Sequence, residues 1–66
     1  MDIFRKIHQL IKDIDRDPFK GLGKPEPLRY ELQGYWSRRI NREHRLIYKT
    51  LKEEIVITSI FGHYND

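Results

Sequence analysis

The sequence predicts an α+β fold in which an N-terminal helix packs on a three-stranded antiparallel β-meander. Two observations lead to this prediction. An apolar stripe with helical spacing opens the chain, and segments of alternating or β-branched residues follow a proline-rich stretch. With 66 residues and no cysteine, the whole chain (1–66) is expected to form one small domain without disulfides or thiolate metal ligands.

The first element is expected to be a helix from about Asp2 to about Asp15. Asp2 is a suitable N-cap, and Pro18 prevents the helix from continuing much further. One side of this helix carries an apolar stripe formed by Ile3, Phe4, Ile7, Leu10, Ile11 and Ile14. The stripe is wider than three short strands can cover, so part of it is predicted to be exposed. His8 lies beside the stripe and is interpreted as an ordinary surface residue.

A stretch rich in proline and glycine, Pro18–Pro27, follows the helix and is expected to form a constrained loop. Glu26 lies in this loop between two prolines. Proline on both sides restricts the backbone around the carboxylate, which suits a side chain that must be held in one direction. The alternative interpretation is an ordinary solvated acid.

After a short turn or strand at Leu28–Gln33, the pattern predicts three strands. The first is Tyr35–Ile40, and the polar segment that follows it forms a turn. The second strand is Arg45–Thr50. The third, Ile55–Phe61, is an almost continuous β-branched run, so it is expected to be the most deeply buried strand.

The hairpin formed by the first two of these strands concentrates positive charge. Alternation places three residues on each face of the first strand: Tyr35, Ser37 and Arg39 on one, and Trp36, Arg38 and Ile40 on the other. If Arg39 and Arg45 share a face, their guanidinium groups meet across the strands and favour an anion between them, such as a phosphodiester. Salt bridges to Glu31, Glu43 or Asp13 are the alternative.

The net charge of +3 is typical of a protein with a polyanionic or acidic partner. No apolar run approaches the roughly 20 residues needed to span a bilayer, so no membrane association is predicted and a cytoplasmic protein is expected. His63 follows the last strand, where it could serve as a general acid or simply be exposed. The histidines show no ligand spacing, so neither a metal site nor a cofactor is predicted.

A constrained carboxylate, a pair of arginines and a histidine are together the groups needed to cleave RNA without a metal. A base removes the proton of the ribose 2′-OH, arginines neutralise the phosphorane, and an acid protonates the leaving 5′-oxygen. Each group alone is weak support for this chemistry, and the combination is stronger.

The segment GKPEPLRYELQGYWSRRINREHRLIY, with a β-branched strand and His-Tyr after it, closely resembles the YoeB/Txe family of bacterial toxins in the RelE superfamily. The resemblance covers about Ile3–Tyr64. It implies a ribosome-dependent mRNA endonuclease (an mRNA interferase) that blocks translation and is neutralised by a YefM/Axe-type antitoxin. Family members begin with an additional strand and helix, so the resemblance implies a truncated RelE-like fold.

The resemblance also implies roles for individual residues. The implied catalytic residues are Glu26 as general base, Arg45 as the phosphate-stabilising group and His63 as general acid. The implied RNA-binding residues are Arg29, Arg39 and Tyr64. Two functions remain open: an active endoribonuclease toxin, and a non-catalytic truncated module that binds its antitoxin or RNA without cleaving. Homodimers are also predicted, because the apolar stripe and the unpaired strand edges need cover.

Overall fold

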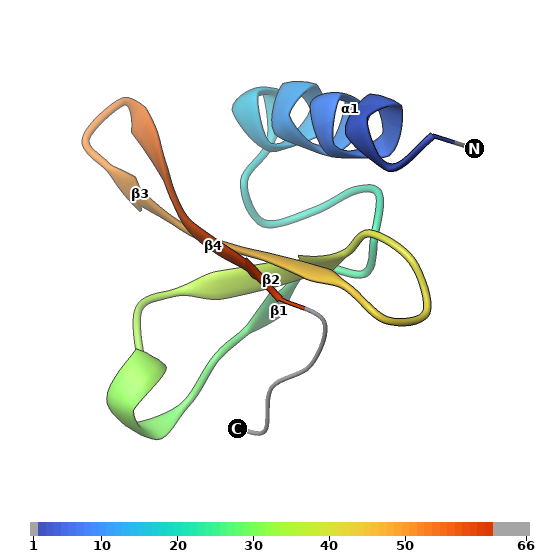
Figure 1. Cartoon of the computed structure of the whole chain (residues 1–66). Helices are drawn as coiled ribbons and strands as arrows, with labels where there is room; N and C mark the ends of the chain where they lie inside the picture. Colours follow the sequence, from blue (N-terminus) through green and yellow to red (C-terminus); the bar gives the residue numbers. More distant parts are fainter. Residues whose placement is uncertain (1, 62–66) are drawn as a thin grey trace.

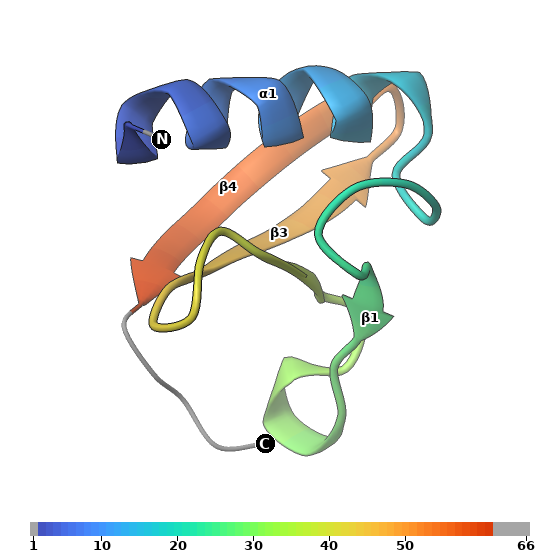
Figure 2. The same cartoon turned by 90° about the vertical axis from the view of Figure 1, so that its right-hand side faces the viewer.

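The structure is a computed structural model that describes residues 2–61. Its elements in chain order are α1 (Ile3–Arg16), β1 (Glu26–Pro27), the 3₁₀ turn η1 (Tyr30–Leu32), β2 (Trp36–Arg39), β3 (Arg45–Leu51) and β4 (Glu54–Phe61). The strands form one antiparallel sheet in the order β1-β2-β3-β4. Helix α1 lies over one side of this sheet and η1 lies on the other side (Figures 1 and 2). Within the described residues, no helix has the length and apolar character to cross a membrane.

Helix α1 agrees with the prediction to within one residue at each end. The side chain of Asp2 caps it by accepting the N–H of Phe4 at 3.0 Å. The apolar stripe is less exposed than expected, because Leu10 and Ile14 are fully buried against the sheet. Ile3, Ile7 and Ile11 pack partly against the same core. The surplus of apolar surface predicted for the stripe as a whole, including Leu10 and Ile14, is therefore wrong for these two residues, and of the stripe it is Phe4 that is largely exposed, at 76%.

The core lies between α1 and the face of the sheet beneath it. Its fully or almost fully buried members are Leu10, Ile14, Ile40, Leu46 and Tyr48. Burial of such side chains contributes roughly 1.5–3 kcal/mol each, which makes this layer the main source of stability in a chain of this size.

The expectation that Ile55–Phe61 would be the most buried strand is wrong. Strand β4 is at the edge of the sheet, and its Ile57 and Ile60 are exposed. Strand β3 takes the central place because it pairs with β2 on one side and β4 on the other. A β-bulge at Ile47/Tyr48 shifts the register between β3 and β4.

The sheet has four strands, whereas three were expected. The additional strand is β1, at the end of the segment predicted to be only a loop. Glu26 pairs with Ser37 and Pro27 pairs with Trp36. Proline is compatible with this position because an edge strand needs hydrogen bonds on one side only. The next residue, Leu28, extends the contact by donating its N–H to Tyr35 O at 2.9 Å.

A buried arginine connects the core to the loop between α1 and β1. Arg38 is fully buried, and its Nε donates to Tyr48 Oη at 3.2 Å. Its Nη1 donates to the carboxylate of Asp13. The remaining N–H groups reach backbone oxygens of the loop, those of Asp17, Lys20 and Leu22. Tyr48 Oη in turn donates to Pro18 O at 2.6 Å.

Gly23 attaches the end of this loop to β2. Its carbonyl accepts the N–H of Arg39 at 2.6 Å. Its φ is 79°, and a Cβ at this position would lie only 2.8 Å from Arg39 O. Both the backbone conformation and the close approach therefore require glycine. Because the loop is attached at Arg38 and at Gly23, the position of the following strand β1 is well defined.

Asp13 supplies the carboxylate that binds the buried arginine. It accepts the backbone N–H of Leu22 at 2.8 Å and also binds Arg38 and Arg16. These interactions, the hydrogen bond from Leu22 first, lower the pKa of Asp13 from 3.8 to about 2. A carboxylate whose pKa is lowered in the folded state stabilises the fold above its unfolded pKa, and this stabilisation is lost as the pH falls.

We therefore expect Asp13→Asn to destabilise the chain at pH 7, because the amide cannot replace the charge beside Arg38. The difference in unfolding free energy between wild type and variant should shrink as the pH falls from about 5 towards 2. Urea unfolding followed by circular dichroism at several pH values measures this difference. Asp15→Asn, an exposed change on the same helix, is the control. If the difference in unfolding free energy between wild type and Asp13→Asn stayed constant across this pH range, the lowered pKa of Asp13 in the folded state would be contradicted.

Candidate functional site

The face of the sheet turned away from α1 carries the residues predicted to bind an anion. Paired residues share a face and neighbours along a strand alternate. Since Trp36, Leu46 and Tyr48 pack against the helix, Ser37 and Arg45 must point to the opposite side.

Glu26 and Arg45 meet on this face, although they lie on strands separated by β2. Arg45 Nη2 is 3.5 Å from Glu26 Oε1, and Arg45 Nη1 donates to Ser37 Oγ at 3.0 Å. The Glu26 side chain is 58% exposed and that of Arg45 is 28% exposed. The ion pair is therefore open to solvent and weak, so a phosphate can reach the guanidinium and compete for it.

Arg39 is directly opposite Arg45 across the hairpin, so the condition under which their guanidinium groups share a face is met. Arg39 is exposed, and it forms no ion pair with any residue of the described part of the chain. The alternative carboxylates do not neutralise the two arginines. Asp13 binds Arg16 and Arg38 instead. Arg39 and Arg45 therefore leave an excess of positive charge on an open surface, and this charge favours the binding of an anion.

Two further basic side chains extend this surface. Lys49 follows on the same strand face as Arg45, and its Nζ lies 5.0 Å from the centroid of the Tyr35 ring. Arg29 is exposed immediately before η1. No hydrogen bond or ion pair within residues 2–61 connects Arg29 to Arg45.

The structure thus brings together Glu26, Arg45 and Arg39 from three strands. His63 and Tyr64, the other two predicted site residues, lie outside the described residues. Among residues 2–61, no group of three His, Asp or Glu side chains is placed to hold a metal ion.

Sequence reasoning did not assign roles to Ser37 and Arg38. The signal for Arg38 was present, because alternation placed it with Trp36 and Ile40 on the face that packs against α1. A charged residue on a core face must find buried partners, and here it does. Ser37 gave no signal of its own, since a small polar residue suits many strand positions.

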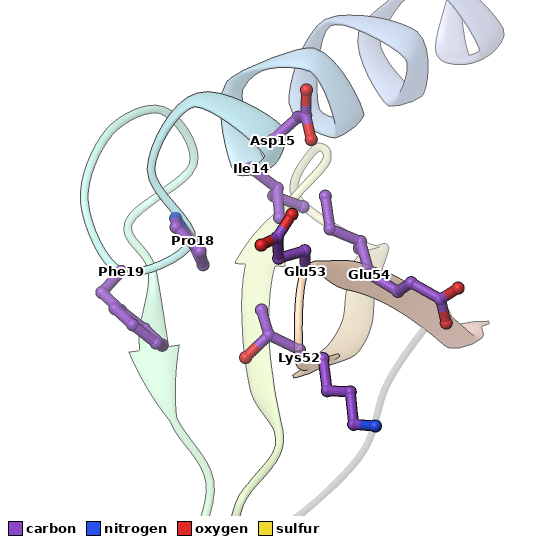
Figure 3. A pocket seen from close by; sticks show the side chains of 9 residues that line it. Ile14, Asp15, Pro18, Phe19, Lys52, Glu53 and Glu54 are labelled. Carbon is purple, nitrogen blue, oxygen red and sulfur yellow. The ribbon is translucent and has the colours of Figure 1, made fainter.

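A cavity of about 430 Å³ lies at a different place, between the end of α1, the Pro18–Phe19 segment and the turn from β3 to β4 (Figure 3). Its lining residues are Ile14, Asp15, Pro18, Phe19, Thr50, Lys52, Glu53, Glu54 and Ile55. None of the predicted site residues among residues 2–61 lines it. Its three carboxylates make it an unsuitable site for a phosphate.

Comparison with known proteins supports a family assignment. A family profile described as the YoeB-like toxin of the bacterial type II toxin-antitoxin system matches residues 1–64. Toxin YoeB of Streptomyces coelicolor is 55% identical over 62 residues, which are 94% of this chain and 74% of that protein.

Two solved structures from Staphylococcus aureus are also similar. One is the YoeB-YefM complex, with a TM-score of 0.87, and the other is the YoeB dimer, with a TM-score of 0.85. In each, the identity is 49%, and the match covers 94% of this chain and 72% of the other. The residues matched by the family profile include the helix, the sheet and the strands that carry Glu26 and Arg45. The chain therefore belongs to the YoeB-like toxins of bacterial type II toxin-antitoxin systems.

Proposed function

We propose that this toxin is an endoribonuclease that cleaves mRNA on the ribosome without a metal ion. The observation that supports the proposal is the placement of Glu26 and Arg45 within 3.5 Å of each other on an open basic face, with Arg39 opposite Arg45. A carboxylate can accept the proton of an attacking 2′-OH, and a guanidinium pair can stabilise the charge that develops on the phosphate, so this arrangement suits phosphodiester cleavage by an internal hydroxyl.

In the proposed reaction, Glu26 accepts the proton of a ribose 2′-OH. The 2′-oxygen attacks the adjacent phosphorus, and the bond to the 5′-oxygen breaks. Arg45 stabilises the charge that develops on the non-bridging oxygens, and His63 donates a proton to the leaving oxygen. Arg29, Arg39 and Tyr64 hold the RNA. The products are a 2′,3′-cyclic phosphate and a 5′-OH.

The exposure of the Glu26–Arg45 pair is consistent with this sequence of events. Because the contact is long and partly solvated, little free energy is lost when a substrate phosphate takes Arg45 away from the carboxylate. Glu26 then becomes free to accept a proton while the guanidinium is already next to the reacting phosphate.

We further infer that the partner is a YefM/Axe-type antitoxin, since the Staphylococcus aureus relative was solved with YefM. An acidic antitoxin segment would neutralise Arg29, Arg39 and Arg45. The relative also forms a dimer, and in this chain a second copy would cover two features: the exposed Phe4, and the outer edge of β4, which pairs with no other described strand. Residues 1–66 would act as one toxin domain, in the cytoplasm, where ribosomes and mRNA are available.

A purified translation system with ribosomes and a defined mRNA tests the proposal. Cuts located at codons are expected when the toxin is added to translating ribosomes, and none when RNA alone is supplied. Stable binding to ribosomes or antitoxin without any cut would overturn the proposed activity and support a non-catalytic binding module instead.

Arg45→Ala should lower the single-turnover cleavage rate by roughly 100-fold, the usual effect of losing one preorganised contact to developing charge. Ribosome binding should change much less, because Arg29 and Arg39 remain. The control is Arg5→Ala, which removes the same charge from an exposed position on α1. Equal losses of rate in the two variants would show that overall charge, not the position of Arg45, matters.

Glu26→Gln should slow cleavage by a similar factor of about 100, since an amide cannot accept the 2′-OH proton. Glu31→Gln, an exposed change in η1, should leave the rate unchanged. Analysis of the RNA ends provides a second measurement, in which a 2′,3′-cyclic phosphate and a 5′-OH are expected. A 5′-phosphate would mean that water had attacked, which is incompatible with the role given to Glu26.

Antitoxin binding should weaken steeply with salt, because the Debye length falls from roughly 10 Å at 0.1 M to about 3 Å at 1 M ionic strength. Calorimetric titration of the toxin with its antitoxin across this range measures the effect. Arg39→Ala should reduce both the affinity and its dependence on salt. An affinity that does not change with salt would exclude a mainly electrostatic contact.

A further inference from the structure

Ser37 occupies the position between Glu26 and Arg45, two of the three proposed catalytic side chains. It lies in the middle of β2, where its neighbours across the sheet are Glu26 of β1 and Ile47 of β3. Its side chain is 0% exposed although the surface around it is polar and open. A hydroxyl at such a place cannot rely on bulk water for its hydrogen bonds and must be satisfied by a neighbouring group.

The partner of this hydroxyl is Arg45. Arg45 Nη1 donates to Ser37 Oγ at 3.0 Å, while Arg45 Nη2 is directed towards Glu26 Oε1 at 3.5 Å. The two terminal nitrogens of one guanidinium therefore contact two adjacent strands. Because the group is planar and rigid, a contact at one nitrogen determines where the other nitrogen points.

The two contacts differ in what they can do during a reaction. The contact with Glu26 is long and exposed, so a bound phosphate can replace it. The contact with Ser37 is short and its acceptor is buried, so it can persist when the phosphate arrives. An arginine side chain has several freely rotating bonds, and holding it in one direction before the reaction lowers the entropic cost of reaching the transition state.

We propose that Ser37 is a positioning residue that holds the Arg45 guanidinium in the direction needed to meet the reacting phosphate. The inference rests on the proposed function and adds a residue to it. Ser37 has no contact with the substrate in this scheme and acts through Arg45. The same β2 segment holds both parts of the site, since Arg38 orders the loop before β1 and Ser37 orders the guanidinium.

The first test compares Ser37→Ala with wild type in single-turnover cleavage on the ribosome. Alanine fits the space of serine and keeps the backbone pairing of β2. The rate should fall by roughly tenfold, as for the loss of a hydrogen bond to a charged group, with ribosome affinity unchanged. Ser59→Ala is the matched control, because Ser59 is also in the sheet, opposite Ile47, but makes no hydrogen bond to Arg45. An unchanged rate in Ser37→Ala would overturn the proposal.

A double-mutant cycle separates positioning from a general structural effect. If Ser37 acts only through Arg45, then Ser37→Ala should cost nothing further in an Arg45→Ala background. A loss of the same size in both backgrounds would mean that Ser37 supports the fold, and the proposal would be wrong. Ser37→Cys provides a second variant in case alanine impairs folding, and its weaker acceptor should give an intermediate rate.

A measurement without RNA distinguishes failure of this inference from failure of the proposed function. In ¹⁵N spectra of the free toxin, hindered rotation of the Arg45 guanidinium should separate its terminal nitrogen signals, and Ser37→Ala should merge them. If the wild-type toxin never cleaves mRNA but Ser37→Ala merges the signals as expected, then Ser37 does hold the Arg45 guanidinium and the proposed endoribonuclease function is wrong. If Ser37→Ala leaves the signals separated, positioning is wrong, whatever the activity.

Discussion

The hydrogen bonds of the buried Arg38 guanidinium are the interactions on which the rest of the structure depends. An arginine side chain has five N–H donors, and here five hydrogen bonds satisfy them. One acceptor is Asp13 of the helix, one is Tyr48 of the central strand, and three are loop carbonyls. A buried charge is tolerated only when it is paired and fully hydrogen-bonded, so helix, sheet and loop must all adopt their places together.

This constraint explains how such a short chain holds an ordered site. The loop from Asp17 to Gly23 has little apolar core of its own, since Phe19 and Leu22 are both about half exposed. The conformation of this loop is fixed by its carbonyl groups, which accept hydrogen bonds from the side chains of Arg38 and Tyr48. Because the loop leads directly into β1, the same contacts determine where Glu26 meets the neighbouring strand.

The charges of the hairpin divide between the two faces of the sheet. Arg38 points into the core and is neutralised by Asp13, whereas Arg39 and Arg45 point to the open face. Arg39 and Arg45 are therefore available to an anion, whereas Arg38 is not. Neighbouring residues with the same side chain therefore have opposite roles, one in the stability of the fold and one in the proposed binding of RNA or antitoxin.

Local patterns in the sequence were sufficient for the helix and for the hairpin. The period of the apolar residues, the Asp2 cap and Pro18 define α1, and strand alternation made Arg39 and Arg45 a candidate pair, whose shared face the register of the hairpin then established. Residues close in sequence determine these features, so a short window contains the needed information. The YoeB resemblance was likewise readable from the GKPEP and WSRRI–HRLIY segments.

Strand order and burial were decided only by the tertiary structure. Strand β4 has a more continuous apolar sequence than β3, yet β3 is central, because a strand's burial depends on which neighbours pair with it. In the same way, the position of Glu26 in the sheet depends on the loop before it, which Arg38 and the Gly23–Arg39 hydrogen bond hold in place. Contacts between distant residues such as Asp13 and Arg38 carry that information, and no local pattern records them.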